Sequence, residues 1–344
     1  WLAILFSICL LMMCLGTGNM PQISSIAVVM NDTFNIPKFI TGAVLAVLLW
    51  MVIIGGIKRI AQIASKLVPF MAFWYLVGSF AVIISNYENI IPSIQSIFIH
   101  VFTPAAAVGG FLGASVAAAL TRGVNRGLYS NEAGQGSAPI AHASSKTENP
   151  IEEGMVSILE PFIDTIVICT ITGLVILSSG VWSEKFENTF EESSICFLNE
   201  NLSDDSSSDV IKLRDYIYSC SGNLALSSDL DVVAGKIMYS DFTLMHNRSV
   251  AEDFLVYSSS NELFEGSLSV VGGKLNNSNV FIEGSSLLIG ADLTGKAFTR
   301  SVFGEYGQYI VAIGLLLFAF STAIAWSYYG DRATVHLFGE YWVF

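Results

Sequence analysis

The chain has 344 residues, of which 53% are hydrophobic, and its formal net charge is −13. So large an apolar share excludes an ordinary soluble domain and indicates several membrane-spanning helices. The charge is concentrated, because residues 181–300 hold eighteen acidic against eight basic residues. This acidity excludes nucleic acid as a partner, since nucleic-acid binding needs basic patches.

Both ends of the sequence lie close to apolar segments. It begins at Trp1 within an apolar run, without a charged leader, and it ends at Phe344 without a polar tail. A signal peptide is therefore not supported. We interpret the sequence as a fragment that lacks membrane segments at both ends.

Six apolar stretches are long enough, or nearly long enough, to cross a membrane. They are 2–30, 39–57, 67–84, 105–120, 154–180 and 306–329. Residues 90–104 have a short amphipathic pattern instead. Lys58, Arg59 and Lys66 are expected in a short basic loop between the second and third stretches.

Two glycines and a proline interrupt the first stretch. Gly16, Gly18 and Pro21 favour a broken helix with free backbone groups, and Asn19 and Gln22 add side-chain amides. Broken helices of this kind line the substrate sites of transporters. The alternative is a kinked helix whose polar groups are satisfied by neighbouring helices.

Residues 122–143 are polar and glycine-rich, although apolar stretches flank them. We expect their glycines and Pro139 to break any long helix; the glycines are Gly123, Gly127, Gly134 and Gly136. Polar groups that donate or accept hydrogen bonds lie between them: Arg126, Ser130, Asn131, Glu132, Ser137 and His142. Irregular polar backbone beside membrane helices needs cover from protein or a water-filled cavity. We interpret this stretch as a gate with Asn131 and Glu132 as candidate residues. The alternative is a rigid connector braced by Glu132–Arg126 contacts.

Two acidic residues lie one helical turn apart in the fifth stretch, Glu160 and Asp164. Ionisable groups within a membrane helix indicate function. Glu160 is close enough to the start of the helix to reach water, which leaves Asp164 as the candidate for a polar cavity. A structural hydrogen bond between helices is the alternative for Asp164.

The last apolar stretch ends with polar groups. Adjacent hydroxyls at Ser321 and Thr322, one turn before Trp326, offer oxygen ligands to a hard monovalent cation. The alternative is that both hydroxyls donate to carbonyls of the preceding helical turn.

The stretch 182–290 forms a polar, acidic insert. Residues 203–209 are predicted to be a flexible loop, and alternating runs at 236–244, 254–257, 267–271 and 279–283 predict a small β-rich module. Its only cysteines, Cys196 and Cys220, can form a disulfide if the compartment is oxidising. We therefore expect membrane helices at 1–181, the insert at 182–290, and a membrane helix with a cytoplasmic end at 291–344.

The bias of basic residues predicts the orientation. With six spans, the loops at 58–66 and 122–153 and the end after residue 330 lie on one side of the membrane. They hold Lys58, Arg59, Lys66, Arg122, Arg126, Lys146 and Arg332, whereas the other side has only Lys38 outside the insert. The basic loops are therefore expected in the cytoplasm and the insert outside it.

Residues 126–143, RGLYSNEAGQGSAPIAHA, closely resemble the signature loop of the sodium:alanine (alanine or glycine:cation) symporter family. Other segments resemble this family in the same order: GTGNMPQ at 16–22, GGIKRI at 55–60, KLVPFM at 66–71, FIDT at 162–165, FAFST at 318–322 and WSYYGDR at 326–332. The resemblance covers nearly all of 1–182 and 290–340. The insert is expected to have no counterpart in the family.

The resemblance implies an all-α polytopic membrane protein with part of a LeuT-type inverted-repeat fold. The six spans resemble the third to eighth helices of the family, so that the first helix and the closing helices are missing. The implied function is symport of sodium and a small neutral amino acid, alanine or glycine, into the cell by alternating access. Sodium is then the coupling ion, no cofactor is needed, and the protein is a monomer in the bacterial inner membrane.

The family pattern also implies roles for single residues. Those that match segments near the substrate are Gly16, Gly18, Asn19 and Gln22, with Trp326 as an aromatic wall of the pocket. Ser321 and Thr322 match the sodium site.

Two other classes of function are possible alternatives. A membrane-anchored sensor or binding protein would work through the acidic insert, whose length favours this alternative. An enzyme is not expected, because no nucleophile or metal-ligand spacing accompanies His142 and Glu132.

Overall fold

The computed structural model describes residues 1–102, 116–130, 132, 135–204, 206–214, 216, 220, 222–276 and 279–339. The chain forms two compact units. The first, called the helical unit below, consists of Trp1–Ile90, Arg122–Ser179 and Thr294–Phe344. The second, called the β unit, consists of Ile91–Thr121 and Gly180–Leu293.

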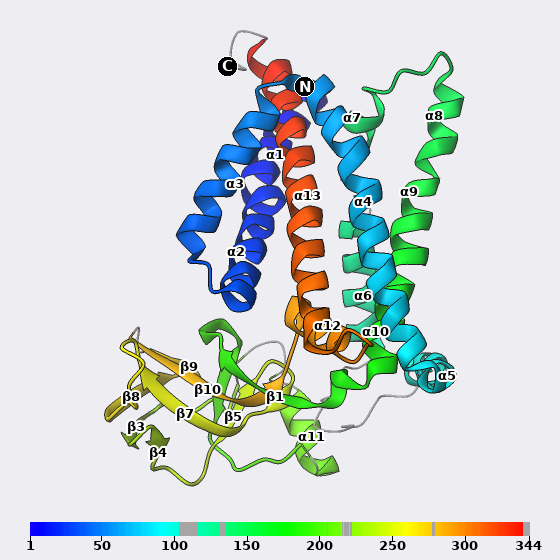
Figure 1. Ribbon diagram of the computed structural model, residues 1–344. Helices are drawn as coiled ribbons and strands as arrows, with labels where there is room; N and C mark the ends of the chain where they lie inside the picture. The colour runs from blue at the N-terminus through cyan, green and yellow to red at the C-terminus, as the bar shows by residue number, and fades with distance from the viewer. Residues whose placement is uncertain are drawn as a thin grey trace. The chain divides into compact units, whose positions relative to one another are not determined.

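The helical unit contains most of the apolar stretches (Figure 1). Its elements, two of which extend into the other unit, are α1 (Leu2–Met13), η1 (Cys14–Asn19), α2 (Met20–Phe34), α3 (Lys38–Ile53), α4 (Gly56–Ser85), η2 (Tyr87–Asn89), α6 (Val116–Ser130), α7 (Ala138–His142), α8 (Pro150–Ser157), α9 (Leu159–Pro161), η3 (Phe162–Ile168), α10 (Cys169–Ser179), α12 (Gly290–Thr299), η6 (Gly304–Tyr306) and α13 (Gly307–Phe338). Long apolar helices of this kind fit a membrane protein.

Within the described residues, four continuous helices are long and apolar enough to cross a membrane. They are Leu2–Asn31, Arg59–Ser85, Pro150–Ser179 and Gly304–Phe338. A fifth apolar helix, Lys38–Ile53, is shorter. Most of the expected span at 105–120 lies outside the described residues. The structure thus contains four of the six expected spans at full length.

The first apolar stretch remains helical, so the prediction that it is broken at Gly16–Gln22 was wrong. The π-helical turn η1 joins α1 to α2, and Pro21 stands in the first turn of α2, directly after the π turn. A π turn widens the helix and leaves its path continuous. The expected stretch of free backbone is therefore replaced by one locally widened turn.

Of two further expectations about helix ends, one was wrong and one held in part. The basic residues expected in a loop lie in the first part of α4, which begins at Gly56 and contains Pro69 in its interior. Gly123 and Gly127 lie inside α6, whereas α6 ends before Gly136, whose φ is 80°, and Pro139 stands in the first turn of the short helix α7. A glycine inside a helix costs only about 1 kcal/mol relative to alanine, which tertiary packing readily offsets.

The helix α13 is the centre of the helical unit. It contacts α1, α2, α3, α4 and η1, and Figure 1 shows it between α1–α3 and α4. Trp74 of α4 donates its indole N–H to the carbonyl of Ile310 at 3.2 Å. Tyr75 shares a 2.7 Å hydrogen bond with Thr172 of α10. These bonds fix α4 between α13 and α10.

The described residues of the β unit form ten strands. They are β1 (Lys185–Phe190), β2 (Ile195–Leu198), β3 (Ser228–Val233), β4 (Lys236–Ile237), β5 (Thr243–His246), β6 (Ser249–Val250), β7 (Glu252–Ser258), β8 (Gly266–Val271), β9 (Lys274–Leu275) and β10 (Val280–Leu287). The unit also contains α5 (Ile90–Phe102, except its first residue), η4 (Val181–Ser183), η5 (Glu192–Ser194) and α11 (Ser207–Arg214).

All strand pairs are antiparallel and form three sheets, with the orders β1-β10-β7, β2-β5-β6 and β4-β3-β8-β9. Alternate residues of β10 are buried, as expected when one sheet face packs on a core. The core contains the buried side chains of Phe197, Leu244, Leu268 and Ile282. This cluster lies entirely within the β unit.

The strands agree only in part with the alternating runs in the sequence. The run 236–244 is divided between β4 and β5, and the strands β1 and β2 precede the region in which strands were expected. The loop expected at 203–209 ends in the first residues of α11. Cys196 and Cys220 form a disulfide.

The disulfide gives a prediction for stability. Replacing both cysteines by alanine is expected to lower the unfolding free energy of the β unit by about 2–4 kcal/mol, because the crosslink restricts the unfolded chain. Denaturant unfolding of the full chain, followed by hydrogen exchange in β2 and β5, measures this loss. Unchanged exchange in these two strands would contradict it.

Candidate functional site

The contact between η1 and α13 joins two segments that are far apart in the sequence. A Cβ atom on Gly18 would lie 2.5 Å from Cδ2 of the Trp326 indole, so only glycine permits this packing. Trp326 is 4% exposed and packs edge-on against Tyr329 at a centroid distance of 5.6 Å. The two segments expected near the substrate are therefore in direct contact.

The Asn19 side chain follows the π turn. Its Nδ2 donates to the carbonyl of Cys14 at 3.0 Å, which satisfies a carbonyl in the widened turn. Its Oδ1 is buried and has no hydrogen-bond partner among the described residues. Buried acceptors are normally paired, so this oxygen is available to a cation or a donor.

The hydroxyls of Ser321 and Thr322 both donate to the carbonyl of Phe318, at 2.8 and 3.0 Å. Their oxygen lone pairs remain available as acceptors. Thr322 lies one turn before Trp326, on the same face of α13. The Ser321 hydroxyl is 3.7 Å from the sulfur of Met71 in α4.

Glu132 follows the end of α6 with a left-handed backbone, φ 54°, which is uncommon for a residue other than glycine. Ser137, which is fully buried, donates to Glu132 Oε2 at 2.6 Å. Burial raises the pKa of the Glu132 carboxyl, and the hydrogen bond from Ser137 opposes this rise. The carboxyl therefore gains a proton more readily than an exposed glutamate.

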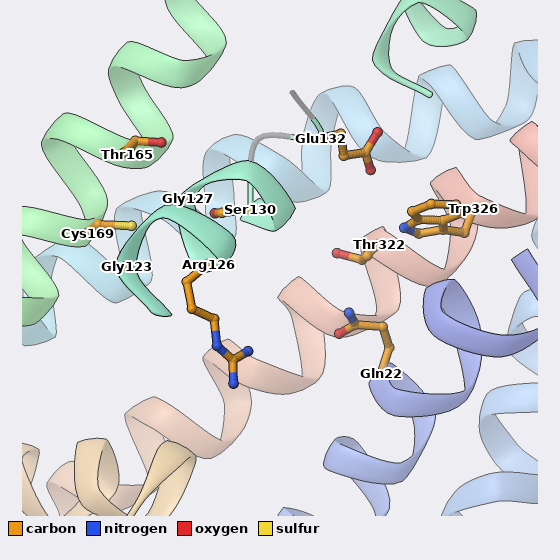
Figure 2. A pocket seen from close by; sticks show the side chains of 10 residues that line it. All are labelled: Gln22, Gly123, Arg126, Gly127, Ser130, Glu132, Thr165, Cys169, Thr322 and Trp326. Atoms are coloured by element: carbon orange, nitrogen blue, oxygen red, sulfur yellow. The ribbon is translucent and has the colours of Figure 1, made fainter. Parts of the chain in front are cut away.

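Of the residues described above, Trp326, Thr322 and Glu132 line a cavity of about 620 Å³ in the helical unit. Its lining comes from α2, α6, the segment after α6, η3, α10 and α13: Gln22, Gly123, Arg126, Gly127, Ser130, Glu132, Thr165, Cys169, Thr322 and Trp326. Figure 2 shows the Gln22 amide, the Thr322 hydroxyl and the indole N–H of Trp326 directed toward the same space. The volume is in the range of small-molecule sites.

Four of the predicted site residues line this cavity: Gln22, Glu132, Thr322 and Trp326. Gly18 supports Trp326 from outside the lining, and a Cβ on Gly16 would meet nothing within 4 Å. The Asp164 carboxylate accepts from the Ser130 hydroxyl at 2.5 Å, a hydrogen bond between η3 and α6. Asn131 lies outside the described residues.

Sequence reasoning missed the lining face of α6. Gly123, Arg126, Gly127 and Ser130 recur at intervals of three and four, which is the spacing of one helical face. Because glycine disfavours a helix, Gly123 and Gly127 predicted a helix break, and the helical spacing of the four residues was overlooked. Thr165 and Cys169 of η3 and α10 show the same spacing.

A second polar network lies at α7. His142 Nδ1 is 2.6 Å from Glu153 Oε1, and its Nε2 is 3.4 Å from Glu160 Oε2. The hydrogen bond with Glu153 raises the pKa of His142 above its ordinary value. Protonated His142 therefore links α7 to α8 and α9.

Comparison with known proteins identifies relatives among transporters. The profile of the sodium:alanine symporter family matches residues 1–209 and 275–344. An uncharacterized transporter of Haemophilus influenzae is 31% identical over 340 residues, which are 98% of this chain and 52% of that protein. The sodium/alanine symporter AgcS of Methanococcus maripaludis is 43% identical over 166 residues, 48% of this chain and 36% of that protein.

A relative with a different named substrate is also similar. The probable sodium/glutamine symporter GlnT of Bacillus subtilis is 34% identical over 182 residues, 53% of this chain and 37% of that protein. The chain thus spans about half the length, or less, of the curated relatives it matches.

The family match corrects the prediction that 182–290 has no counterpart in the family. The match extends to residue 209 and resumes at 275, so that only 210–274 fall outside it. The relative from Haemophilus influenzae aligns along 98% of the chain, which includes most of this remaining stretch.

Gly18 and Gly16 form a matched pair for testing the site. Gly18→Ala is expected to displace the Trp326 indole and to lower the thermal midpoint by several degrees, because overpacking costs about 1–3 kcal/mol. Gly16→Ala is the control, since its Cβ would meet nothing within 4 Å. Equal thermal midpoints for the two variants in detergent would contradict the predicted packing.

His142 gives a prediction about pH. Its folded-state pKa lies above the ordinary 6.5, so its contribution to stability is full below 6.5 and is lost as the pH rises through the raised value. His142→Gln should therefore destabilise the protein more at about pH 5.5 than at about pH 9. Thermal unfolding of both proteins across this range measures the difference, and a constant difference would contradict the pairing.

Proposed function

Because the chain belongs to the sodium:alanine symporter family, we propose that it is part of a secondary transporter. This transporter moves a small neutral amino acid, alanine or glycine, into the cell together with sodium. The proposal is supported most by the cavity that Gln22, Thr322 and Trp326 line between helices far apart in the sequence.

Sodium is proposed as the coupling ion at the hydroxyl oxygens of α13. Thr322 faces the cavity, and its oxygen keeps acceptor capacity after donating to Phe318. Ser321, on the neighbouring position, is proposed as a second ligand. One positive charge that moves through 100 mV gains about 2.3 kcal/mol, enough for roughly 50-fold accumulation.

The substrate is proposed to lie beside the Trp326 indole. Gly18 holds the indole in place from behind, and Gln22 offers an amide from α2. An aromatic wall limits the space beside the substrate and favours a short side chain. Gly16 and Asn19 would then contribute from η1, and Asp164 would hold η3 against α6.

We further propose a LeuT-type fold with alternating access for the complete protein, in which the cavity opens in turn to each side. Glu132, after α6, is a candidate for the gate, and Asn131 remains a second one. We propose the plasma membrane as its location, and the charge bias supports an orientation with the insert outside the cytoplasm. The disulfide Cys196–Cys220 supports this location, since disulfides persist in oxidising compartments.

A sensor or binding protein is the second candidate function. The observation in its favour is that the β unit has its own hydrophobic core and disulfide. In that case ligand binding would depend on the β unit and would be independent of sodium.

The pair Thr322 and Thr334 tests the transporter proposal. Both donate their hydroxyls to the carbonyl four residues earlier, but only Thr322 lines the cavity. Sodium-dependent binding of radiolabelled L-alanine by the full chain in detergent should weaken about 10-fold in Thr322→Ala, since a hydrogen bond or ligand to a charged group contributes about 1.5–3 kcal/mol. Thr334→Ala should bind as the unmodified protein does. Alanine binding that is independent of sodium, or equal losses in both variants, would contradict the proposal.

A further inference from the structure

The β unit contains an internal repeat. Residues 228–237, SDLDVVAGKI, match residues 266–275, GSLSVVGGKL, and both segments form a strand, a two-residue turn and a short strand. The first segment is β3–β4 and the second is β8–β9. Both residues of each turn have positive φ, 50° and 76° in the first turn and 57° and 75° in the second, as in type I′ hairpins. The two hairpins therefore have the same backbone conformation.

The hydrogen bonds around the two hairpins also correspond. Gly235 donates to the carbonyl of Phe264 at 3.0 Å, and its own carbonyl accepts from Val256 of β7 at 2.8 Å. Gly273 donates to the carbonyl of Leu226 at 2.7 Å, and its own carbonyl accepts from β2 at 2.9 Å. The strand β2 pairs with β5 as β7 pairs with β10, and the shared sheet has the symmetric order β4-β3-β8-β9 (Figure 1). The strands β2 to β5 and β7 to β10 are thus two copies of one arrangement.

The two copies differ in the connection that follows their first strand. In the first copy, residues 199–227 lead from β2 to β3 and contain α11 and Cys220, whose disulfide with Cys196 fastens the connection to β2. In the second copy, residues 259–265 lead from β7 to β8, and this copy contains no cysteine. Because the second copy forms the same hairpin and bonds with a short connection, the repeat does not require the longer one to fold. The longer connection and its disulfide therefore indicate a separate role.

A cavity of about 300 Å³ lies beside this disulfide, within the β unit. Its lining includes Ile195 and Met245, each 2% exposed, and both cysteines of the disulfide. The hydroxyl of Tyr216, another lining residue, accepts from the N–H of Leu224 at 3.0 Å and keeps its own proton for donation. The volume is at the lower end of the range of small-molecule sites. The cavity therefore combines an apolar wall with a polar donor.

The charged residues in the described lining of this cavity are both basic, Arg248 and Lys274. Residues 181–300 hold eighteen acidic and eight basic residues, so two of the few cations line one cavity that no described acidic side chain lines. Lys274 is exposed and belongs to none of the ion pairs between described side chains. Arg248 also interacts within the chain, so Lys274 is the charge that a ligand reaches more directly. This charge distribution suits an anion.

We propose that this cavity binds a small organic anion, with a carboxylate or phosphate group on a short apolar body. Arg248 and Lys274 pair with the anionic group, and the Tyr216 hydroxyl donates a further hydrogen bond to it. The side chains of Ile195 and Met245 contact the apolar body. This site belongs to the β unit and goes beyond the proposed transport.

The test uses probes that separate the charge from the apolar body. Butyrate, butyl phosphate and neutral butyramide share one alkyl chain and differ in the head group, whereas inorganic phosphate has the charge without the chain. Their binding to the full chain in detergent is measured by calorimetry at low ionic strength, without sodium or alanine. Butyrate or butyl phosphate should bind about 10-fold more tightly than both butyramide and inorganic phosphate. The tighter of these two anions identifies the preferred head group.

The internal repeat supplies a matched control. Lys236 stands at the same place in the first hairpin as Lys274 in the second, and both are exposed, but only Lys274 lines the cavity. Lys274→Gln should weaken the tighter anion about 10-fold, because it removes a charged hydrogen-bond donor. Lys236→Gln should bind this anion as the unmodified chain does. Equal thermal midpoints establish that the compared variants are folded.

Hydrogen exchange locates the bound anion. The strands β2 and β5 carry the lining residues Ile195 and Met245, and β7 and β10 are their counterparts in the second copy. The tighter anion should therefore slow exchange in β2 and β5 and leave β7 and β10 nearly unchanged. Equal slowing in both strand pairs would contradict the location.

The binding measurements can also overturn the proposal. It is wrong if neither butyrate nor butyl phosphate binds more tightly than butyramide, or if Lys274→Gln binds the anion as well as Lys236→Gln does. Because sodium and alanine are absent from these measurements, their outcome is independent of the proposed transport function.

Discussion

The contact of Gly18 with the Trp326 indole is the constraint on which the site depends. A Cβ at residue 18 would lie 2.5 Å from the ring, so the helix that contains η1 approaches α13 as closely as backbone and indole allow. The same indole faces the cavity, and Thr322 lies one turn away from it. Because α13 also contacts α2, α3 and α4, the close contact between Gly18 and Trp326 places the N-terminal helices beside the cavity wall.

Among the described residues, two π turns lie on helices that line this cavity. The turn η1 contains Gly18, and η3 contains Thr165, which lines the cavity from the other side. A π turn shifts the register of all later side chains on its helix without ending the helix. In this way two long apolar helices keep their backbone hydrogen bonds in a membrane and still direct polar side chains inward.

The β unit is stabilised by different interactions from the helical unit. Its strands enclose a core of their own around Phe197, Leu244 and Leu268, and a disulfide links Cys196 to Cys220. Lys185 pairs with Asp204 and Glu252, so part of the excess acidity is neutralised within the unit. The family match omits 210–274, which include β3 to β8. The unit therefore joins a segment shared with the family to one outside the family profile.

The sequence by itself determined the apolar helices, the family and the residue types of the site. The thickness of the bilayer sets the length of a spanning helix, so an apolar stretch of that length can be recognised from the local sequence. Motifs such as those at 16–22 and 318–322 can be recognised in the same way, because their residue types do not depend on how the helices pack. Trp326, Thr322 and Gln22, which the amino-acid sequence predicted as site residues, all line the cavity. The strands β1 and β2 could not, because their pairing partners lie about 50 to 100 residues away.

Only the tertiary structure decided what the glycines and prolines do. Gly16, Gly123 and Gly127 looked like breaks, but the penalty of about 1 kcal/mol for a helical glycine is smaller than the packing energy of a long helix. Once 116–130 is a helix, Arg126 points to the same side as Ser130 and joins the cavity. The spacing of three and four residues in α6 marks one face of the helix, but which neighbours that face meets depends on contacts between distant segments.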